Sequence, residues 1–296
     1  MRWPTKSPHL LVLWLARAVW LVVAVLGGGG FGEALARHSR EVQLTGTTLL
    51  WIGWATVAVA LAVPAVVALT ISRMTVPLGT VTAAAAVVHA GASSATILAV
   101  VSTALASLVV ASGEFGQAMA QASAYGDEER FPLRPPAAFY VPSAVSWSVL
   151  CACALIGPLA LAGRGWFVGT SLTVIAGALA WFLIPRFHRL SRRWVVLVPA
   201  GLVFHDHVVL AETVMFPARI VTGARLALVD TEAADLTGPA GGHAVEISLS
   251  ESTSVVLATT RANPGGRALH VMAFLLTPTR PGRLLRSMGE RSISVG

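Results

Sequence analysis

Long apolar blocks separated by short polar segments dominate the first 185 residues of the chain. The clear blocks are Leu10–Leu26, Leu49–Ile71, Ala144–Ala162 and Trp166–Ile184. Each is close to the roughly 20 residues that a helix needs to cross the hydrocarbon core of a membrane. The pattern therefore predicts an α-helical transmembrane bundle over residues 1–185.

The stretch Val76–Ser112 is too long for one span, because about 37 residues would form a helix of about 55 Å. The reversal that the sequence offers is Gly91-Ala-Ser-Ser94, which predicts a short helix Val76–Ala90 and a fuller one Ala95–Val110. This reading gives six spans. Five spans stay possible, with Val76–Ala90 as a re-entrant segment.

Composition and charge support a membrane protein and suggest its orientation. Of the 296 residues, 55% are hydrophobic and 12% are charged, whereas about a quarter of the residues in a soluble domain are charged. With six spans, both termini share one side, and placing them in the cytoplasm puts most flanking arginines inside, as the positive-inside rule requires. We expect a multi-pass protein of the cell membrane with both termini cytoplasmic.

The excess of basic residues, +7 in net charge, flanks the apolar blocks instead of gathering on one face, so we expect no nucleic-acid partner. A basic juxtamembrane linker, residues 186–193, follows the last block. Its arginines are expected to meet anionic lipid headgroups; they are Arg186, Arg189, Arg192 and Arg193.

From Trp194 onward the pattern changes to short β-rich runs separated by turn formers, which predicts a small antiparallel β domain over residues 194–296. About seven strands are expected, including Trp194–Val198, Leu202–His205 and Ala244–Leu249. The end of the chain predicts a short helix with Thr279 as its N-cap.

Three segments resemble a group of uncharacterised actinobacterial multi-span membrane proteins that carry a C-terminal bacterial pleckstrin-homology-like (PH-like) domain. They are the runs Arg193–Asp206, Tyr125–Pro136 and Thr277–Gly282. The resemblance implies a PH-like fold and no particular activity. PH-like folds elsewhere bind phosphoinositides or peptides through a basic loop, but the first hairpin loop here, Pro199-Ala-Gly201, has no Lys or Arg.

The polar loop Gly113–Pro142 carries the candidate interaction residues of the membrane half. They are Tyr125, Asp127, Glu128, Arg130 and Arg134. Prolines in this loop forbid a continuous helix. Charge pairs would allow the loop to dock on the β domain or on a partner, and a solvated loop held by its prolines is the alternative.

Motifs for catalysis, cofactors and metals are weak. The glycine run Gly27–Gly32 follows an apolar helix, not a strand, so we interpret it as a flexible helix end and not as a dinucleotide site.

His205-Asp-His207 offers two imidazoles where a metal site needs three or four ligands, and a turn is the preferred interpretation. Cys151 and Cys153 point to different sides of one helix. We expect no catalytic residue, cofactor or metal.

Two polar residues lie within predicted spans. Arg17 is expected either to reach the cytoplasmic interface or to pair with Glu33 or Glu114, and His89 is a candidate proton-relay group.

These observations favour a noncatalytic membrane protein whose cytoplasmic β domain acts as a scaffold or interaction module for a protein partner. A transporter or channel component using Arg17 and His89 is the first alternative, and an envelope enzyme acting on a lipid-linked substrate is the second.

Overall fold

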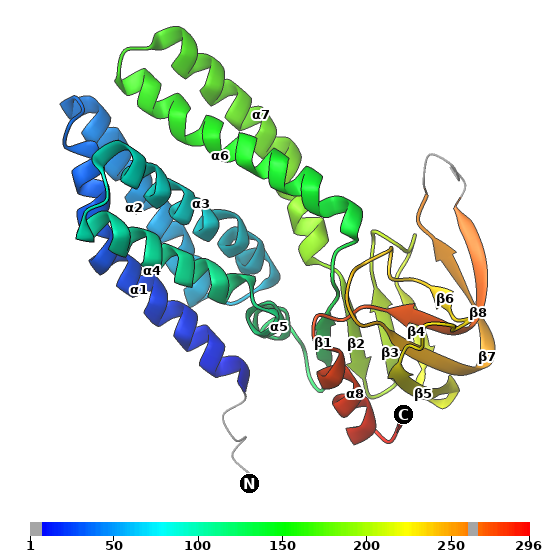
Figure 1. Cartoon of the computed structure of the whole chain (residues 1–296). Helices are drawn as coiled ribbons and strands as arrows, with labels where there is room; N and C mark the ends of the chain where they lie inside the picture. Colours follow the sequence, from blue (N-terminus) through cyan, green and yellow to red (C-terminus); the bar gives the residue numbers. More distant parts are fainter. Residues whose placement is uncertain (1–7, 260–265) are drawn as a thin grey trace. The chain divides into compact units, whose positions relative to one another are not determined.

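The computed structural model describes residues 8–259 and 266–296, and the chain divides into two compact units (Figure 1). The first unit comprises Met1–Ala122 and Ala144–Arg186, and the second comprises Ser123–Ser143 and Phe187–Gly296. The second unit therefore includes residues 123–143, which belong to the polar loop that the sequence pattern places in the membrane half.

Six helices of the described chain are long and apolar enough to cross a membrane, which confirms a multi-pass membrane protein with six candidate spans. The helices are α1 (Pro8–Leu35), α2 (Arg40–Ala62), α3 (Val66–Ala90), α4 (Ser94–Ala111), α6 (Tyr140–Ala162) and α7 (Trp166–Ser191). A shorter helix, α5 (Gly113–Gln121), follows α4.

The boundary between the second and third spans differs from the predicted one. Helix α2 ends at Ala62 and α3 begins at Val66, so the expected span Leu49–Ile71 is divided and α3 is a full-length helix. The break coincides with Pro64, which has no N–H to donate and disfavours helical backbone at the preceding residue. The predicted reversal is confirmed: Gly91, at φ +95°, ends α3, and Ser93 caps α4.

Small residues and paired tryptophans hold the first helices together. Trp20 Nε1 donates to the carbonyl of Trp54 at 3.0 Å, and Trp54 Nε1 donates to the carbonyl of Trp20 at 3.2 Å. Gly30 is helical and lies against Ala95 of α4, where a Cβ would approach a carbonyl oxygen to 2.6 Å. The glycine run is thus part of α1 and not a flexible helix end. Small residues such as Gly30 allow the close helix contacts that are common in membrane proteins.

Helices α6 and α7 also meet through glycines. A Cβ on Gly157 of α6 would lie 2.8 Å from the backbone nitrogen of Thr173 in α7. Trp147 Nε1 donates to the carbonyl of Met74 in α3 at 3.0 Å. The two cysteines of α6 are free and buried, so they contribute to packing.

The second unit contains two sheets (Figure 1). The first has the order β1-β2-β3-β4 and is antiparallel, with β1 (Glu129–Pro132), β2 (Trp194–Val198), β3 (Gly201–His205) and β4 (Val214–Pro217). The second has the order β6-β8-β7-β5-β9, with β5 (Val221–Leu226), β6 (Ala234–Asp235), β7 (Val245–Leu257), β8 (Arg267–Leu276) and β9 (Ser294–Val295). This second sheet is mixed and not purely antiparallel, because β6 and β9 pair in parallel with their neighbours.

A shared apolar core joins the two sheets. Phe216 of β4 stacks on Phe274 of β8 at 4.6 Å between ring centroids, and Phe204 of β3 also stacks on Phe274, at 6.1 Å. Helix α8 (Pro281–Glu290) buries Leu284, Leu285 and Met288 in the same core. Its N-cap is Arg280, without a side-chain cap, so the expected cap from Thr279 is wrong.

Candidate functional site

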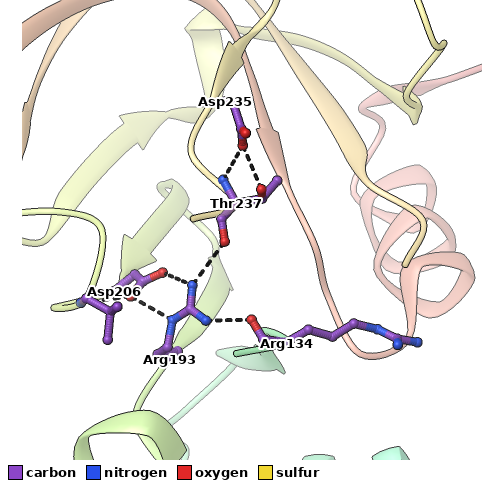
Figure 2. Close-up of polar contacts among 6 residues, drawn as sticks. Arg134, Arg193, Asp206, Asp235 and Thr237 are labelled. Carbon is purple, nitrogen blue, oxygen red and sulfur yellow. Dashed lines mark hydrogen bonds and ion pairs between the residues drawn. The ribbon is translucent and has the colours of Figure 1, made fainter. Parts of the chain in front are cut away.

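A buried ion pair between Arg193 and Asp206 fastens the second unit (Figure 2). Arg193 Nε and Nη2 donate to the two carboxylate oxygens of Asp206 at 2.8 and 2.7 Å. The same guanidinium donates to the carbonyls of Arg134 and Thr237. Only 1% of Arg193 is exposed. A buried charge is tolerated only when it is paired as completely as this. Through these hydrogen bonds, Arg193 links the β2–β3 hairpin with the segment after β1 and the segment after β6.

This position corrects the expected role of Arg193, which is unavailable to lipid headgroups, whereas Arg186, Arg189 and Arg192 are exposed. The hairpin register pairs Trp194 with His205, so the preceding and following residues, Arg193 and Asp206, face each other. Opposite charges at the two open ends of a predicted hairpin were the sequence signal for this pair.

The loop with the candidate interaction residues contributes a strand to the second unit. Strand β1 pairs with β2, with Arg130 opposite Val196, and the Arg130 guanidinium lies 5.4 Å from the centroid of the Trp194 ring. Arg130 also pairs with Glu128 at 2.6 Å. The pairing of β1 agrees with docking on the β domain and not with a solvated loop. Tyr125, before the strand, is 90% exposed.

Asp127 lies next to this strand and contributes its backbone. Arg291 Nη2 donates to the carbonyl of Asp127 at 2.7 Å. Glu129, which opens β1, pairs with Arg283 of α8 at 3.5 Å. The contacts of the loop with external partners stay a prediction.

His205 and His207 lie at the end of β3, beside the buried ion pair. Their ring centroids are 4.3 Å apart, and His205 stacks on Trp194 at 5.1 Å. Burial, with the neighbouring His207 and Arg192, lowers the pKa of His205 to about 4. Asp206 forms the expected turn by accepting from Val208 N at 3.0 Å. Within residues 8–259 and 266–296, no three His, Cys, Asp or Glu side chains gather to hold a metal ion.

An open groove of about 1030 Å³ lies on the second sheet. Residues 228–234 line one side and residues 269–273 of β8 line the other, with Arg225 and Glu246 also contributing. In the described chain, β7 pairs along one edge of β8, whereas β6 pairs with the other edge only at Phe274 and Leu275. No part of the described chain therefore pairs with the edge of β8 that borders the groove from residue 269 to residue 273.

The groove combines exposed apolar side chains with one buried carboxylate. Val229 is fully exposed, and Leu228 and Met272 are more than half exposed. Glu246 accepts from Arg225 Nη2 at 2.8 Å and from Thr231 Oγ1 at 2.7 Å. Burial alone would raise the pKa of Glu246, but these hydrogen bonds and the charge of Arg225 outweigh it and lower the pKa. Through its hydrogen bond with Thr231, Glu246 anchors one wall of the groove to the sheet. Sequence reasoning did not indicate this groove.

Arg17 and His89, the polar residues of the predicted spans, lie apart. Arg17 Nε donates to the carbonyl of Leu61 at 2.9 Å, in the last turn of α2, and its guanidinium lies over Trp14. Glu33, one of its expected partners, accepts from Ser93 Oγ instead. His89 is exposed in the last turn of α3. Helix α3 starts at Val66, close to the end of α2 that Arg17 contacts. At about 1.5 Å per residue, His89 lies about 35 Å along α3 from that start. A role for either residue in transport stays a prediction.

Comparisons of this chain with protein-family models, with curated proteins and with solved structures found no match.

Proposed function

We propose that this protein is a noncatalytic multi-pass protein of the cell membrane whose β unit recruits a partner protein from the cytoplasm. The partner binds as an extended segment along the free edge of β8. The observation that carries this proposal is the groove of the second unit, where no described residue pairs with the β8 edge at 269–273, beside the exposed side chains of Leu228, Val229 and Met272.

Physical reasons favour a peptide segment over a small molecule. A free strand edge presents a row of backbone donors and acceptors to an added strand, and side-chain pockets beside it give specificity. The groove is wide and open, whereas sites for small molecules usually enclose most of the ligand surface. Exposed apolar residues such as Val229 lose contact with water when a partner covers them.

The β unit is PH-like under this proposal. Its first sheet is a four-stranded antiparallel meander, strands β5, β7 and β8 form the centre of the second sheet, and one helix, α8, closes the core. This order of elements supports the fold that the sequence resemblance implies. The first strand of the meander comes from the loop between α5 and α6.

Photo-crosslinking in native membranes tests the proposal. A photoreactive residue at position 229 or 272 of the full chain should give one partner adduct, whereas the same residue at Met215, a half-exposed methionine on β4, should not. Met272→Glu should abolish the adduct at position 229, and Met215→Glu should leave it unchanged. Equal labelling at all three positions, or full function of a chain that ends at Arg193, would overturn the proposal.

A further inference from the structure

The segment after β1 and the segment after β8 form a short antiparallel pair outside the named strands. Leu133 bridges to Pro278, Arg134 N donates to the carbonyl of Thr277 at 2.8 Å, and Thr279 N donates to the carbonyl of Pro132 at 2.8 Å. In an antiparallel pair, directly opposite residues project to the same face and alternate residues share a face. The side chains of Arg134, Thr277 and Thr279 therefore lie on one face of this pair.

All three side chains on this face have a buried hydrogen-bonding atom without a partner in the described chain. These atoms are Arg134 Nε, Thr277 Oγ1 and Thr279 Oγ1. Thr277 is only 2% exposed. Buried polar atoms in native proteins are satisfied in the great majority of cases, and an unpaired one costs about 1–3 kcal/mol. Three such atoms on one face point to a ligand that accepts hydrogen bonds from all of them.

Neighbouring contacts hold the backbone of Arg134 in position, and no acceptor in the described chain binds its Nε. Its backbone carbonyl accepts from Arg193, and Figure 2 shows its side chain extending away from that ion pair. Gly242, at φ +105°, covers the guanidinium, and a Cβ there would lie 3.0 Å from Nε. The glycine loop is fixed by Ala137 N, which donates to the carbonyl of Pro239. The loop thus shields Nε from water without supplying an acceptor to it.

We infer that Arg134, Thr277 and Thr279 bind a phosphate group. A guanidinium and hydroxyl donors match the charge and the several acceptor oxygens of a phosphate, and a charged partner makes these hydrogen bonds about twice as strong as neutral ones. The neighbouring chain is also basic, because Arg280, Arg283 and Arg286 follow Thr279 at the start of α8, where Glu129 pairs with Arg283. The phosphate group belongs either to a lipid headgroup or to a soluble phosphate compound.

Calorimetric titration of the full chain in maltoside micelles with inorganic phosphate, against chloride at equal ionic strength, tests this inference. Arg134→Gln and Thr277→Val should each weaken binding about tenfold, the loss expected for one charge-assisted hydrogen bond. Arg219→Gln is the matched control, because Arg219 is an exposed arginine elsewhere on the same unit, and it should bind as the unmodified protein does.

Thermal unfolding without phosphate separates ligand binding from a structural role. Because the Thr277 hydroxyl has no hydrogen-bond partner among the described residues, Thr277→Val should keep or raise the midpoint while it weakens phosphate binding. A clearly lower midpoint would mean that the hydroxyl has a structural partner and would overturn the inference. The inference also fails if no saturable heat is seen up to about 10 mM phosphate, or if both variants bind as the control does.

Lipid nanodiscs distinguish the two sources of the phosphate group. If a lipid headgroup occupies the site, nanodiscs containing phosphatidic acid should lower the apparent affinity for inorganic phosphate relative to phosphatidylcholine nanodiscs, and Arg134→Gln should remove the difference. If the ligand is a soluble phosphate compound, the affinity is the same in both lipids. Both results support the site, and both are independent of the groove beside β8.

Discussion

Residues 187–296 should not form a stable domain without the loop that supplies β1. Removing 123–143 takes Phe131 and Leu133 out of the core, where they are 1% and 5% exposed. It also removes the β1–β2 pairing and the Arg134 carbonyl that accepts from Arg193. This expectation differs from the sequence-based boundary at residue 194.

The magnitude follows from the two core side chains. Deleting a buried phenylalanine costs about 3–5 kcal/mol and deleting a buried leucine costs about 2–5 kcal/mol, so the loop contributes at least about 5 kcal/mol. A whole domain has a free energy of unfolding of only about 5–15 kcal/mol. The fragment 187–296 should therefore be largely unfolded.

Trp194 makes the assay direct, because it is the only tryptophan in residues 187–296 and lies opposite Pro132 of β1. Adding a peptide of residues 123–143 should change its fluorescence saturably and produce a cooperative urea transition. A peptide with Phe131→Asp is the matched control and should do neither. The reasoning is refuted if the fragment alone unfolds cooperatively at a urea midpoint that the peptide does not shift.

Three further changes test the β unit by urea unfolding of the full chain. Asp206→Ala leaves a buried guanidinium without its counter-charge and should lower the free energy of unfolding by about 3–5 kcal/mol; a loss below about 1 kcal/mol would contradict the pairing. The pKa of His205 is lowered to about 4 by burial, whereas unfolded histidine titrates near pH 6.5. The unfolded state therefore binds the proton first, and stability should fall from pH 6.5 to pH 4, with a smaller fall in His205→Asn. Gly201 has φ +150°, and a Cβ would lie 2.1 Å from the carbonyl oxygen of Phe216, so Gly201→Ala should cost about 3 kcal/mol or more. Gly241→Ala, with open space around it, should have little effect.

The helical half was predictable from sequence because each span is a local pattern. The turn at Gly91–Ser93 was visible, since Gly and Ser interrupt an alanine-rich run. The break at Pro64 could not be predicted in the same way. Three other prolines of the chain, Pro77, Pro158 and Pro185, lie inside helices. A proline in an apolar run therefore does not by itself identify a helix end.

In the second unit, local runs predicted most strands but not the long-range pairings. Strand β1 has four residues and pairs with residues more than 60 positions later, a distance at which no sequence periodicity acts. The phosphate site depends on a second long-range contact, the bridge between Leu133 and Pro278, because this bridge brings Arg134 next to Thr277. The Arg193–Asp206 pair was within reach, since it follows from the register of a single hairpin.

The pairing of β1 with β2 also constrains the topology in the membrane. Segments that share one sheet must lie on the same side of the bilayer, because a sheet cannot form across the hydrocarbon core. The chain between β1 and β2 contains the candidate spans α6 and α7, and two crossings return it to the side from which it left. The sheet thus requires an even number of crossings there, independently of the arginine distribution. Cysteines introduced at Tyr125 and Val229, both exposed, must therefore react with an impermeant thiol reagent from the same side. Labelling from opposite sides would mean that β1 does not belong to this sheet, and both the fragment prediction and the phosphate site would fail with it.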